Sequence, residues 1–423
     1  MLRHEDNERL TRVGAGTPGG ELFRRYWIPA LMSSELPEND GAPVRVRLLG
    51  EDLIAFRDSN GDVGLVDAFC PHRRAPMFFG RNEECGLRCV YHGWKFNTRG
   101  HCVDMPSEPE GSTLHQRVKI KAYPCIDKGG IVWTYMGPKE TMPEPPDYEW
   151  MRAPITHRHV SKTYEECNYL QAMEGGLDTA HSSFAHNNNL GNRNEPRLRD
   201  RSPRLDVERT EYGYCYVSFR DLKDGNYYMR IYHFVMPFQQ FRGGIHKFDG
   251  SRREYPELNG HIWVPINDTT TYVYNWACAY DADANFSEDN ILEREYFYGR
   301  GPDQMIPGTF QLKANKSNDY FIDRNKQKSE TYTGIEGINT QDFALQEGMG
   351  PIVDRSLEHL GSSDKAIVAM RRLMLEAVTD VEEGRRPKGA DPKIHAQIRP
   401  YDGFMQTNDN WKEVFAAELT PRW

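Results

Sequence analysis

Two short loops, each with one cysteine and one histidine, constrain the fold of this chain more than any other feature of its sequence. Cys70 and His72 are separated by one residue, and Cys89 and His92, which follow after an interval of sixteen residues, are separated by two. In an extended loop, residues i and i+2 project to the same side, so Cys70 and His72 can reach one centre together. The four side chains can share a metal centre only in a fold that makes the two loops face each other.

Two thiolates and two imidazoles are the donor set of a Rieske [2Fe–2S] centre, in which two cysteines hold one iron and two histidines hold the other. The alternative is a structural zinc ion held by the same four residues. Zinc sites usually begin with two cysteines a few residues apart, and these loops lack such a pair, so the sequence favours the iron–sulfur cluster. Four of the eight cysteines fall within residues 70–102, which suits a metal site in a reducing compartment better than a set of disulfides.

The residues around these loops predict a small domain of short strands. Residues 40–138 contain several short alternating segments, with turns at 58–61 and 97–100. Residues 139–154 contain four prolines and mixed charges, which is typical of a linker between domains.

The rest of the chain predicts a larger domain that combines a sheet with helices. Residues 163–186 predict mainly a helix, and residues 204–280 predict an antiparallel sheet of at least five strands. Residues 362–384 predict a helix with Ser363 as its N-cap. The apolar stripe of that helix consists of Ile367, Met370, Leu373, Met374, Ala377 and Val381.

We therefore expect an α+β protein with three parts. Residues 1–40 form an N-terminal segment that packs on the larger domain, residues 41–140 form the small all-β domain, and residues 141–423 form the larger domain with an antiparallel sheet and flanking helices. The net charge of −9 argues against nucleic acid or an anionic membrane as a partner. No apolar run approaches the ~20 residues of a membrane-spanning helix, and the first residues do not resemble a signal peptide, so we expect a cytoplasmic protein.

A second group of candidate metal ligands lies in the helical segment after the linker. His181 and His186 are five residues apart, a spacing that places them roughly 140° apart on an ideal helix, so they could not share one face. They can converge on one ion only if the helix ends or bends between them, and Ser182 and Ser183 favour such a break. Asp178 precedes His181 by three residues and suits a partner that receives the other ring N–H of a ligating histidine.

Two histidines and one distant carboxylate form the facial triad of non-haem Fe(II) oxygenases, which leaves positions open for O2 and substrate. Spacing alone does not choose the carboxylate. The candidates in the helical last third are Glu336, Asp342, Glu347 and Asp354. Gln171 and Glu174 are further candidates for groups around the iron, although Glu174 could equally be solvated.

Three segments carry a resemblance to a known family. The loop segment CPHRRAPMFFGRNEECGLRCVYHGWKF resembles the Rieske domain of ring-hydroxylating oxygenases, and NYLQAMEGGLDTAHSSFAH resembles their iron-binding motif. The stretch NTQDFALQEGMGPIVDRSLEHLG resembles the corresponding helix of the phthalate dioxygenase-like branch. The resemblance implies that His181, His186 and Asp342 hold a mononuclear Fe(II), with Glu347 as the second choice for the carboxylate.

The same resemblance implies the function of a terminal oxygenase and a homotrimeric assembly. In the family, the cluster of one subunit lies close to the iron of its neighbour, and Asp178 would connect His92 of one subunit to His181 of the other. No nucleotide- or flavin-binding fingerprint is present, so we expect a separate reductase to supply electrons. We expect O2-dependent hydroxylation of a substituted aromatic compound, namely ring dihydroxylation of an aromatic acid such as a phthalate or a benzoate. The alternatives are oxidative O- or N-dealkylation of an aromatic ether or anilide, and a Rieske electron carrier without oxygenase chemistry.

The substrate pocket can be predicted only in outline. Residues 227–241 and 261–266 are rich in aromatic and apolar side chains, which suit an aromatic ring. A carboxylate on that ring would favour bidentate contact with an arginine. Arg204, Arg230 and Arg242 lie in the appropriate third of the chain, and we expect Arg204 and Arg242 to contact the substrate.

Overall fold

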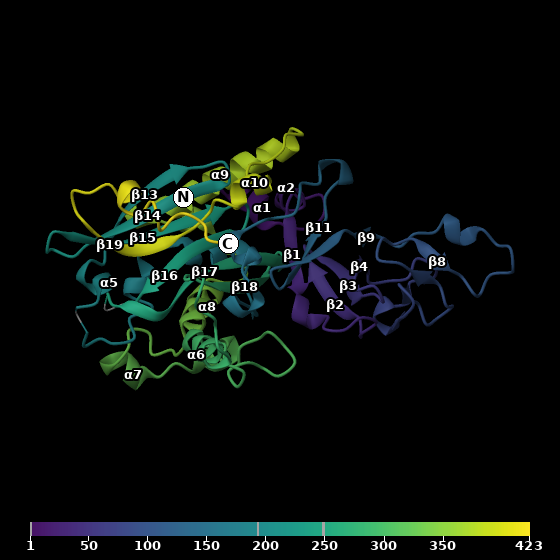
Figure 1. The fold of residues 1–423 in the computed structure, drawn as a ribbon, viewed down its shortest axis with the longest axis horizontal. Helices are drawn as coiled ribbons and strands as arrows, with labels where there is room; N and C mark the ends of the chain where they lie inside the picture. Colours follow the sequence, from purple (N-terminus) through teal and green to yellow (C-terminus); the bar gives the residue numbers. More distant parts are fainter. Residues whose placement is uncertain (1, 193, 248–249) are drawn as a thin grey trace.

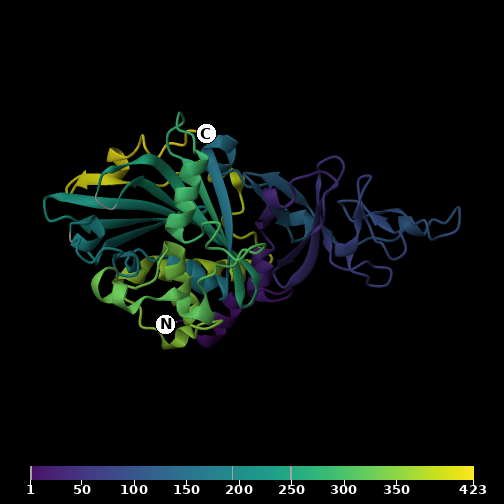
Figure 2. The same ribbon diagram turned by 90° about the horizontal axis from the view of Figure 1, so that it is seen from below.

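The computed structural model describes residues 2–192, 194–247 and 250–423, which form two bodies side by side (Figure 1). The smaller body projects from one end of the larger one, and the turned view in Figure 2 shows the same arrangement. A small β domain is followed by a larger domain with one antiparallel sheet and helices, so the predicted α+β class is confirmed. Among the described residues, no helix combines the length and apolar character that crossing a bilayer requires.

The small body is built from two four-stranded antiparallel sheets. The first consists of β2 (Val44–Leu48), β3 (Glu51–Arg57), β4 (Val63–Asp67) and β9 (Ala122–Tyr123). The second consists of β5 (Arg81–Asn82), β6 (Leu87–Arg88), β7 (Lys95–Phe96) and β8 (Cys102–Asp104). The predicted turn at 58–61 joins β3 to β4, where Asp58 Oδ1 accepts hydrogen bonds from the N–H groups of Asn60 and Asp62. The second sheet and one face of the first enclose a small core of their own, which includes Phe56, Val66 and Phe96. Other buried side chains of the first sheet, such as Val46, Leu53 and Leu65, belong to the core of the larger body.

The N-terminal segment contacts both bodies. Its helices α1 (His4–Thr11) and α2 (Pro18–Phe23) pack on the larger body, where the Tyr169 hydroxyl donates to the Leu10 carbonyl at 2.8 Å. Its strand β1 (Trp27–Met32) forms a separate three-stranded sheet with β11 (Ile131–Tyr135) and β10 (Cys125–Lys128), and this sheet contacts β2 and β4 of the small body. The domain limits at residues 40 and 140 stay predictions.

One large antiparallel sheet forms the centre of the larger body. In spatial order its strands are β12 (Arg158–Glu165), β18 (Thr270–Ala279), β17 (Arg252–Asn267), β16 (Gln239–His246), β15 (Asn226–Val235), β14 (Gly213–Asp221) and β13 (Arg204–Arg209). The prediction of at least five antiparallel strands over residues 204–280 is thus confirmed.

The last strand, β19 (Tyr401–Gln406), enters this sheet between two others. β15 and β16 pair only beside their connecting turn, and β19 pairs with the rest of β15 along residues 226–231. Asp402 joins β19 to β16, because its carboxylate accepts hydrogen bonds from the N–H groups of Ile245 at 2.7 Å and His246 at 3.1 Å. The C-terminal strand therefore fills the gap where β15 and β16 separate.

Helices cover the sheet and connect its strands. They are α3 (Glu149–Arg152), α4 (Tyr169–Leu177), α5 (Pro196–Arg199), α6 (Glu288–Tyr298), α7 (Arg324–Ser329), α8 (Ile338–Gly348), α9 (Lys365–Glu382), α10 (Pro392–His395) and α11 (Trp411–Val414). In Figure 1, α6, α7 and α8 gather on the lower side of the larger body, whereas α9 lies on its upper side.

The helix predicted over residues 163–186 is shorter than expected. Residues 163–165 end the edge strand β12, and α4 begins after Asn168, whose side chain accepts a hydrogen bond from the Leu170 N–H. Gly175 and Gly176 weaken the last turn of α4, which ends at Leu177. A Cβ atom on Gly176 would lie 2.1 Å from the Trp263 ring, so this glycine allows α4 to approach β17 closely.

The second predicted helix also begins slightly later than expected. Ser363 lies in a short 3-10 turn, and α9 begins at Lys365 with Asp364 at the N-cap position, so the prediction of Ser363 as N-cap is wrong. The six residues of the predicted apolar stripe are all buried, which confirms the face that this helix turns to the core.

Candidate active site

The two cysteine–histidine loops have the same backbone hydrogen-bonding pattern. Cys70 N–H donates to the Ala75 carbonyl and Cys89 N–H to the Trp94 carbonyl, each at 2.9 Å and each five residues along the chain. Arg74 and Gly93, each four residues after its cysteine, donate back to the cysteine carbonyl, and both adopt positive φ values, +58° and +79°. The fold therefore presents the two loops as local copies of each other.

In these two loops the cysteine side chains are buried, whereas the histidine side chains lie at the protein surface. Cys70 and Cys89 are buried, whereas His72 is exposed and His92 is half-buried. The two imidazole rings lie 4.5 Å apart, and His72 also stacks on Trp94. Burial raises the pKa of the Cys70 thiol to about 11, and the neighbouring Cys89 adds to the shift. A bound metal centre would offset this effect, because coordination favours the thiolate.

The second group of predicted ligands also comes together. α4 ends at Leu177, before both histidines, and His181 begins a single 3-10 turn that ends at Ser183, so the two histidines do not lie on one continuous helix. His181 Nε2 lies 3.1 Å from His186 Nε2, and Asp342 Oδ1 of α8 lies 3.5 Å and 3.3 Å from these two nitrogens. Three donor atoms thus meet at one point, in the two-histidine, one-carboxylate set that suits Fe(II).

The outer nitrogens of both histidines have partners of their own. Gln341 donates from Nε2 to Asn188 Oδ1 and to the Ile335 carbonyl, so its Oε1 faces His186 Nδ1 at 2.8 Å. His186 Nδ1 must therefore carry the proton, which leaves Nε2 as a bare lone pair. Asp178 Oδ2 lies 3.5 Å from His181 Nδ1, which is an electrostatic contact and not a hydrogen bond of the kind that Gln341 forms. The donor set therefore fits a metal ion.

Asp178 occupies a turn, and the helical face that the sequence predicted is absent. As the C-cap of α4 it has an extended backbone, and its carboxylate accepts hydrogen bonds from the N–H groups of Ala180 at 2.7 Å and His181 at 3.3 Å. Burial raises the pKa of Asp178, but its hydrogen bonds with His181 and Ala180 outweigh burial and lower it. Asp178 is therefore held as a carboxylate beside His181.

The other acidic candidates for the iron site have different partners. Glu336 forms an ion pair with Lys326, Glu347 accepts a hydrogen bond from the Glu166 N–H, and Asp354 caps a short turn. Glu174, for which solvation was the alternative, is buried.

Two further residues of α4 serve the packing of the helix. Glu174 forms ion pairs with Arg355 and Arg371, and Gln171 donates to the carbonyls of Gln346 and Gly350. Both side chains thus tie α4 to α8 and to the segments that follow α8.

A cavity of about 90 Å³ adjoins the three donor atoms. One wall is the sheet, where side chains at alternate positions share one face. This wall consists of Arg230 and Tyr232 from β15, Gln240 and Arg242 from β16, and Asn259 and His261 from β17. The opposite side comes from α4, α6, α8 and the turn that carries His181.

Two arginines in this wall lack an acidic partner. Within the described ranges, neither Arg230 nor Arg242 forms an ion pair, and Arg242 instead donates from Nε to Asn259 Oδ1. Arg230 lies over the Tyr232 ring, with 5.0 Å between its guanidinium carbon and the ring centroid. The wall therefore presents positive charge to the cavity.

Arg204 lies elsewhere, contrary to our expectation. It belongs to the edge strand β13, is about half exposed, and pairs with Asp206 at 2.6 Å. Arg204 is therefore not a residue of this cavity.

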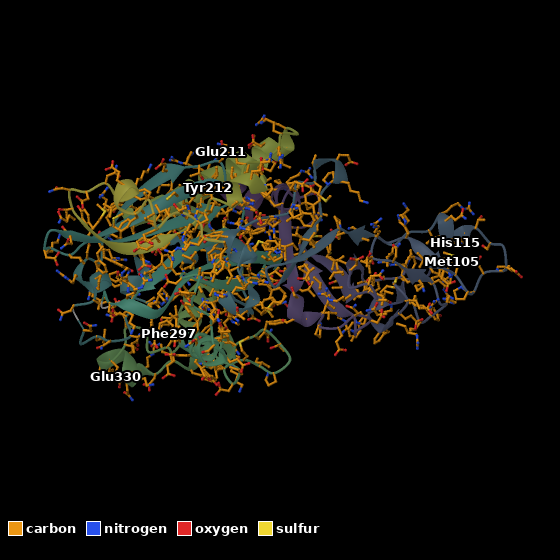
Figure 3. The ribbon with its side chains drawn as sticks, in the orientation of Figure 1. Met105, His115, Glu211, Tyr212, Phe297 and Glu330 are labelled. Carbon is orange, nitrogen blue, oxygen red and sulfur yellow. The ribbon has the colours of Figure 1, made fainter. Side chains whose placement is uncertain are left out.

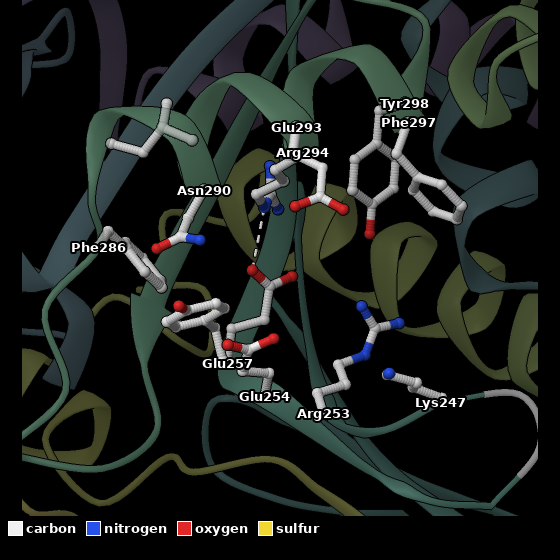
Figure 4. A pocket seen from close by; sticks show the side chains of 12 residues that line it. Lys247, Arg253, Glu254, Glu257, Phe286, Asn290, Glu293, Arg294, Phe297 and Tyr298 are labelled. Carbon is white, nitrogen blue, oxygen red and sulfur yellow. Dashed lines mark hydrogen bonds and ion pairs between the residues drawn. The ribbon is translucent and has the colours of Figure 1, made fainter.

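A second, larger cavity of about 250 Å³ adjoins the first, and Figure 4 shows it between α6 and β17. Arg253, Phe297 and Tyr298 line both cavities. In Figure 4 the guanidinium of Arg253 and the amine of Lys247 lie on the side where the Tyr298 hydroxyl points. The only hydrogen bond of the Arg253 guanidinium within the described residues goes to the His246 carbonyl at 3.3 Å.

Comparison with known proteins agrees with both centres. Residues 26–124 match the Rieske [2Fe-2S] domain family, and residues 134–421 match the LigXa C-terminal domain-like family. The oxygenase subunit of phthalate 4,5-dioxygenase from Pseudomonas putida is 37% identical and covers 98% of this chain and 95% of its own length. The oxygenase subunit of 5,5'-dehydrodivanillate O-demethylase from Sphingobium sp. (strain NBRC 103272 / SYK-6) is 34% identical and covers 94% and 86%, respectively. The crystal structure of dicamba monooxygenase bound to dicamba, only 17% identical, shares the fold with a TM-score of 0.62 and covers 86% of this chain and 99% of its own.

The chain therefore belongs to the Rieske non-haem iron oxygenases. Its relatives, which are oxygenase subunits, place it in the phthalate dioxygenase-like branch as a terminal oxygenase component. Members of this family use a Rieske [2Fe–2S] cluster and a mononuclear iron, and both predicted donor sets are present in this chain.

Proposed function

We propose that this protein hydroxylates an aromatic carboxylate with O2. The observation that carries the proposal is the pair of arginines, Arg230 and Arg242, that face the cavity beside the iron donor set and form no ion pair with any described residue. A guanidinium offers a planar fork of donors that matches a carboxylate, and a cavity lined by unpaired guanidiniums favours an anionic ligand. Two relatives, a phthalate dioxygenase and a 3-chlorobenzoate dioxygenase, are named for aromatic acids.

The proposal assigns each donor residue a role. Cys70, His72, Cys89 and His92 hold the cluster, and His181, His186 and Asp342 hold the iron. When bound, the iron activates O2 and the cluster supplies electrons one at a time. Ring dihydroxylation consumes one O2, two electrons and two protons and adds both oxygen atoms to the ring.

The side chains around these ligands orient, hold protons and exclude water. Arg242, fixed by Asn259, holds the substrate carboxylate, while Gln341 keeps the His186 proton on Nδ1. The Asp178 carboxylate, 3.5 Å from His181 Nδ1, favours a proton on that nitrogen through its negative charge. The close approach of α4 to β17 at Gly176 limits the room for water beside the iron.

We also propose a homotrimer in which Asp178 connects His181 to His92 of a neighbouring subunit. Met105 lies at the far end of the small body in Figure 3, whereas Phe297, which lines the iron cavity, lies in the larger body. A Cβ atom on Gly93, next to His92, would lie 2.6 Å from Pro106, so the cluster loops belong to that far end. Electrons therefore have a short path only if another subunit supplies the cluster.

The eight free cysteines support a cytoplasmic location.

Oxidative O-demethylation of an aromatic ether is the second candidate. The larger adjoining cavity favours it, because it gives a bulkier substrate room beyond the 90 Å³ beside the iron. The LigXa family match and the O-demethylase relative agree with this reaction. Demethylation converts the ether, one O2, two electrons and two protons into a phenol, formaldehyde and water.

The test is turnover by the holoenzyme with a reductase, O2 and two sets of substrates, aromatic acids and methoxyarenes. A product heavier by two hydroxyl groups supports dihydroxylation, and formaldehyde release supports demethylation. A variant with His181→Ala and His186→Ala should keep the cluster spectrum and form no product. Product formation at the wild-type rate in this variant would refute the iron assignment and leave only an electron carrier.

A further inference from the structure

A row of polar side chains on β17 faces the two adjoining cavities and is not explained by metal binding. Glu257 lines the larger cavity, and Asn259 and His261 line the cavity beside the iron donor set. Glu257, Asn259 and His261 alternate along the strand and therefore share one face of the sheet. Glu257 forms an ion pair with Arg294, and Asn259 bridges Glu257 to Arg242, so both are committed to neighbours. His261 ends the row and lines the cavity beside the iron donor set.

The hydrogen bonds around His261 fix which of its ring nitrogens carries the proton. Asn275, its partner on β18, donates from Nδ2 to the Val273 carbonyl at 3.3 Å, so Asn275 Oδ1 must face His261. His261 Nδ1 lies 2.8 Å from this oxygen and must be the N–H donor. A rotated amide would instead place Oδ1 against the Val273 carbonyl oxygen. His261 Nε2 is therefore an unprotonated acceptor.

His261 Nε2 is left without a hydrogen-bond donor in the part of the chain that the structure describes, although the side chain is only 7% exposed. Burial, with the nearby charge of Arg242, lowers the pKa of His261 well below its ordinary value, so the ring stays neutral near pH 7. A buried acceptor without a donor is destabilising unless a ligand or water supplies the hydrogen.

We infer that His261 Nε2 accepts a hydrogen bond from the substrate, so that the cavity selects an aromatic acid that also carries a hydroxyl or amino hydrogen. The carboxylate part of this inference rests on the proposed function, because it assigns that group to Arg242. Arg242 pairs with Asn259 across the two strands, and His261 is two positions further along, which makes Arg242 and His261 diagonal neighbours on one face. The Cα atoms of such diagonal neighbours are roughly 7–8 Å apart. The donor should therefore be meta or para to the carboxylate, because an ortho pair is too close together to reach both.

The test compares ligands that differ only in the donor, by calorimetric titration of the anaerobic holoenzyme without turnover. 4-Hydroxybenzoate should bind about tenfold more tightly than 4-methylbenzoate, and 4-methylphenol more tightly than 1,4-dimethylbenzene. 2-Hydroxybenzoate should lose most of this advantage.

Three variants test whether His261 causes the preference for ligands with a hydroxyl group. His261→Leu should abolish the advantage of the hydroxyl group, and His261→Gln, which can present a carbonyl oxygen, should restore part of it. His233→Leu serves as the matched control, because His233 is a buried histidine of the same sheet whose two nitrogens are bonded to Tyr212 and to the Arg399 carbonyl. This control should keep the preference if it folds with normal metal content.

The neutral and the charged ligand pairs separate the two claims. An unchanged hydroxyl preference in His261→Leu, in both pairs, would overturn the inference about His261. If His261→Leu loses the hydroxyl preference for the phenol pair, the inference about His261 is supported. If benzoates also bind equally well to wild-type protein and to Arg242→Gln, the carboxylate assignment of the proposed function is overturned.

Discussion

Replacing Gln341 by leucine should weaken iron binding without affecting the cluster. Gln341 Oε1 is the partner of His186 Nδ1 at 2.8 Å, and its amide donates to Asn188 and to the Ile335 carbonyl, so leucine removes the group that orients the His186 ring. Loss of such a partner typically weakens metal affinity by about 10–100-fold. That factor corresponds to about 1.4–2.8 kcal/mol of binding free energy.

The assay is a titration of Fe(II) into the anaerobic, iron-depleted protein in competition with a chromogenic chelator. The absorbance of the cluster, which is held by loops of the other body, serves as an internal reference. Gln341→Glu keeps an acceptor toward His186, so this variant should bind iron clearly more tightly than Gln341→Leu.

Gln171→Leu is the matched control. Gln171 is also a buried glutamine, and it donates hydrogen bonds to two backbone carbonyls away from the triad. Its replacement should lower the free energy of unfolding by ~1–3 kcal/mol and leave iron affinity unchanged. Equal iron affinity in Gln341→Leu and wild-type protein would refute the argument that Gln341 fixes the tautomer of His186.

Three more substitutions have defined outcomes. Asp178→Asn should keep both metal contents and slow single-turnover electron transfer from cluster to iron, measured by rapid mixing; an unchanged rate would exclude the connecting role of Asp178. Arg242→Gln should raise KM for an aromatic acid by about 10–100-fold and change KM for a neutral methoxyarene little, because a charge-assisted pair contributes about 1.5–3 kcal/mol. Glu174→Gln should lower the free energy of unfolding by about 3–5 kcal/mol in chemical denaturation, because it deprives the buried Arg355 of the counter-charge of Glu174, whereas Arg371 keeps its ion pair with Glu358. A loss below about 1 kcal/mol would mean that Arg355 finds another partner.

The local donor sets could be predicted from sequence because their members lie close together in the chain. The spacing of Cys70, His72, Cys89 and His92 is itself the pattern. His181 and His186 converge because the helix ends before both of them and a short 3-10 turn ends between them. Asp342 lies far from both histidines in sequence, so spacing could not select it, and the family resemblance did.

The substrate cavity could not be predicted in the same way, because it depends on which face of each strand turns inward. Arg204 stands on an edge strand whose polar side chains face solvent, so its residue type misled the prediction. His261 was missed because it begins an apolar run, and only the polar alternation Glu257, Asn259, His261 could have marked it. Asn275, which fixes its tautomer, is a neighbour only across the sheet.

The placement of β19 means that the iron cavity depends on the end of the chain. Arg230 and Arg242 stand on β15 and β16, and the register partner of Arg230 is Asp402, whose carboxylate also anchors β16. During synthesis, every metal-binding residue is available well before residue 402 has been made. The spacing of the two arginines can be set only after the C-terminal strand has inserted into the sheet. A nascent chain can therefore contain all its metal-binding residues before its substrate cavity is complete.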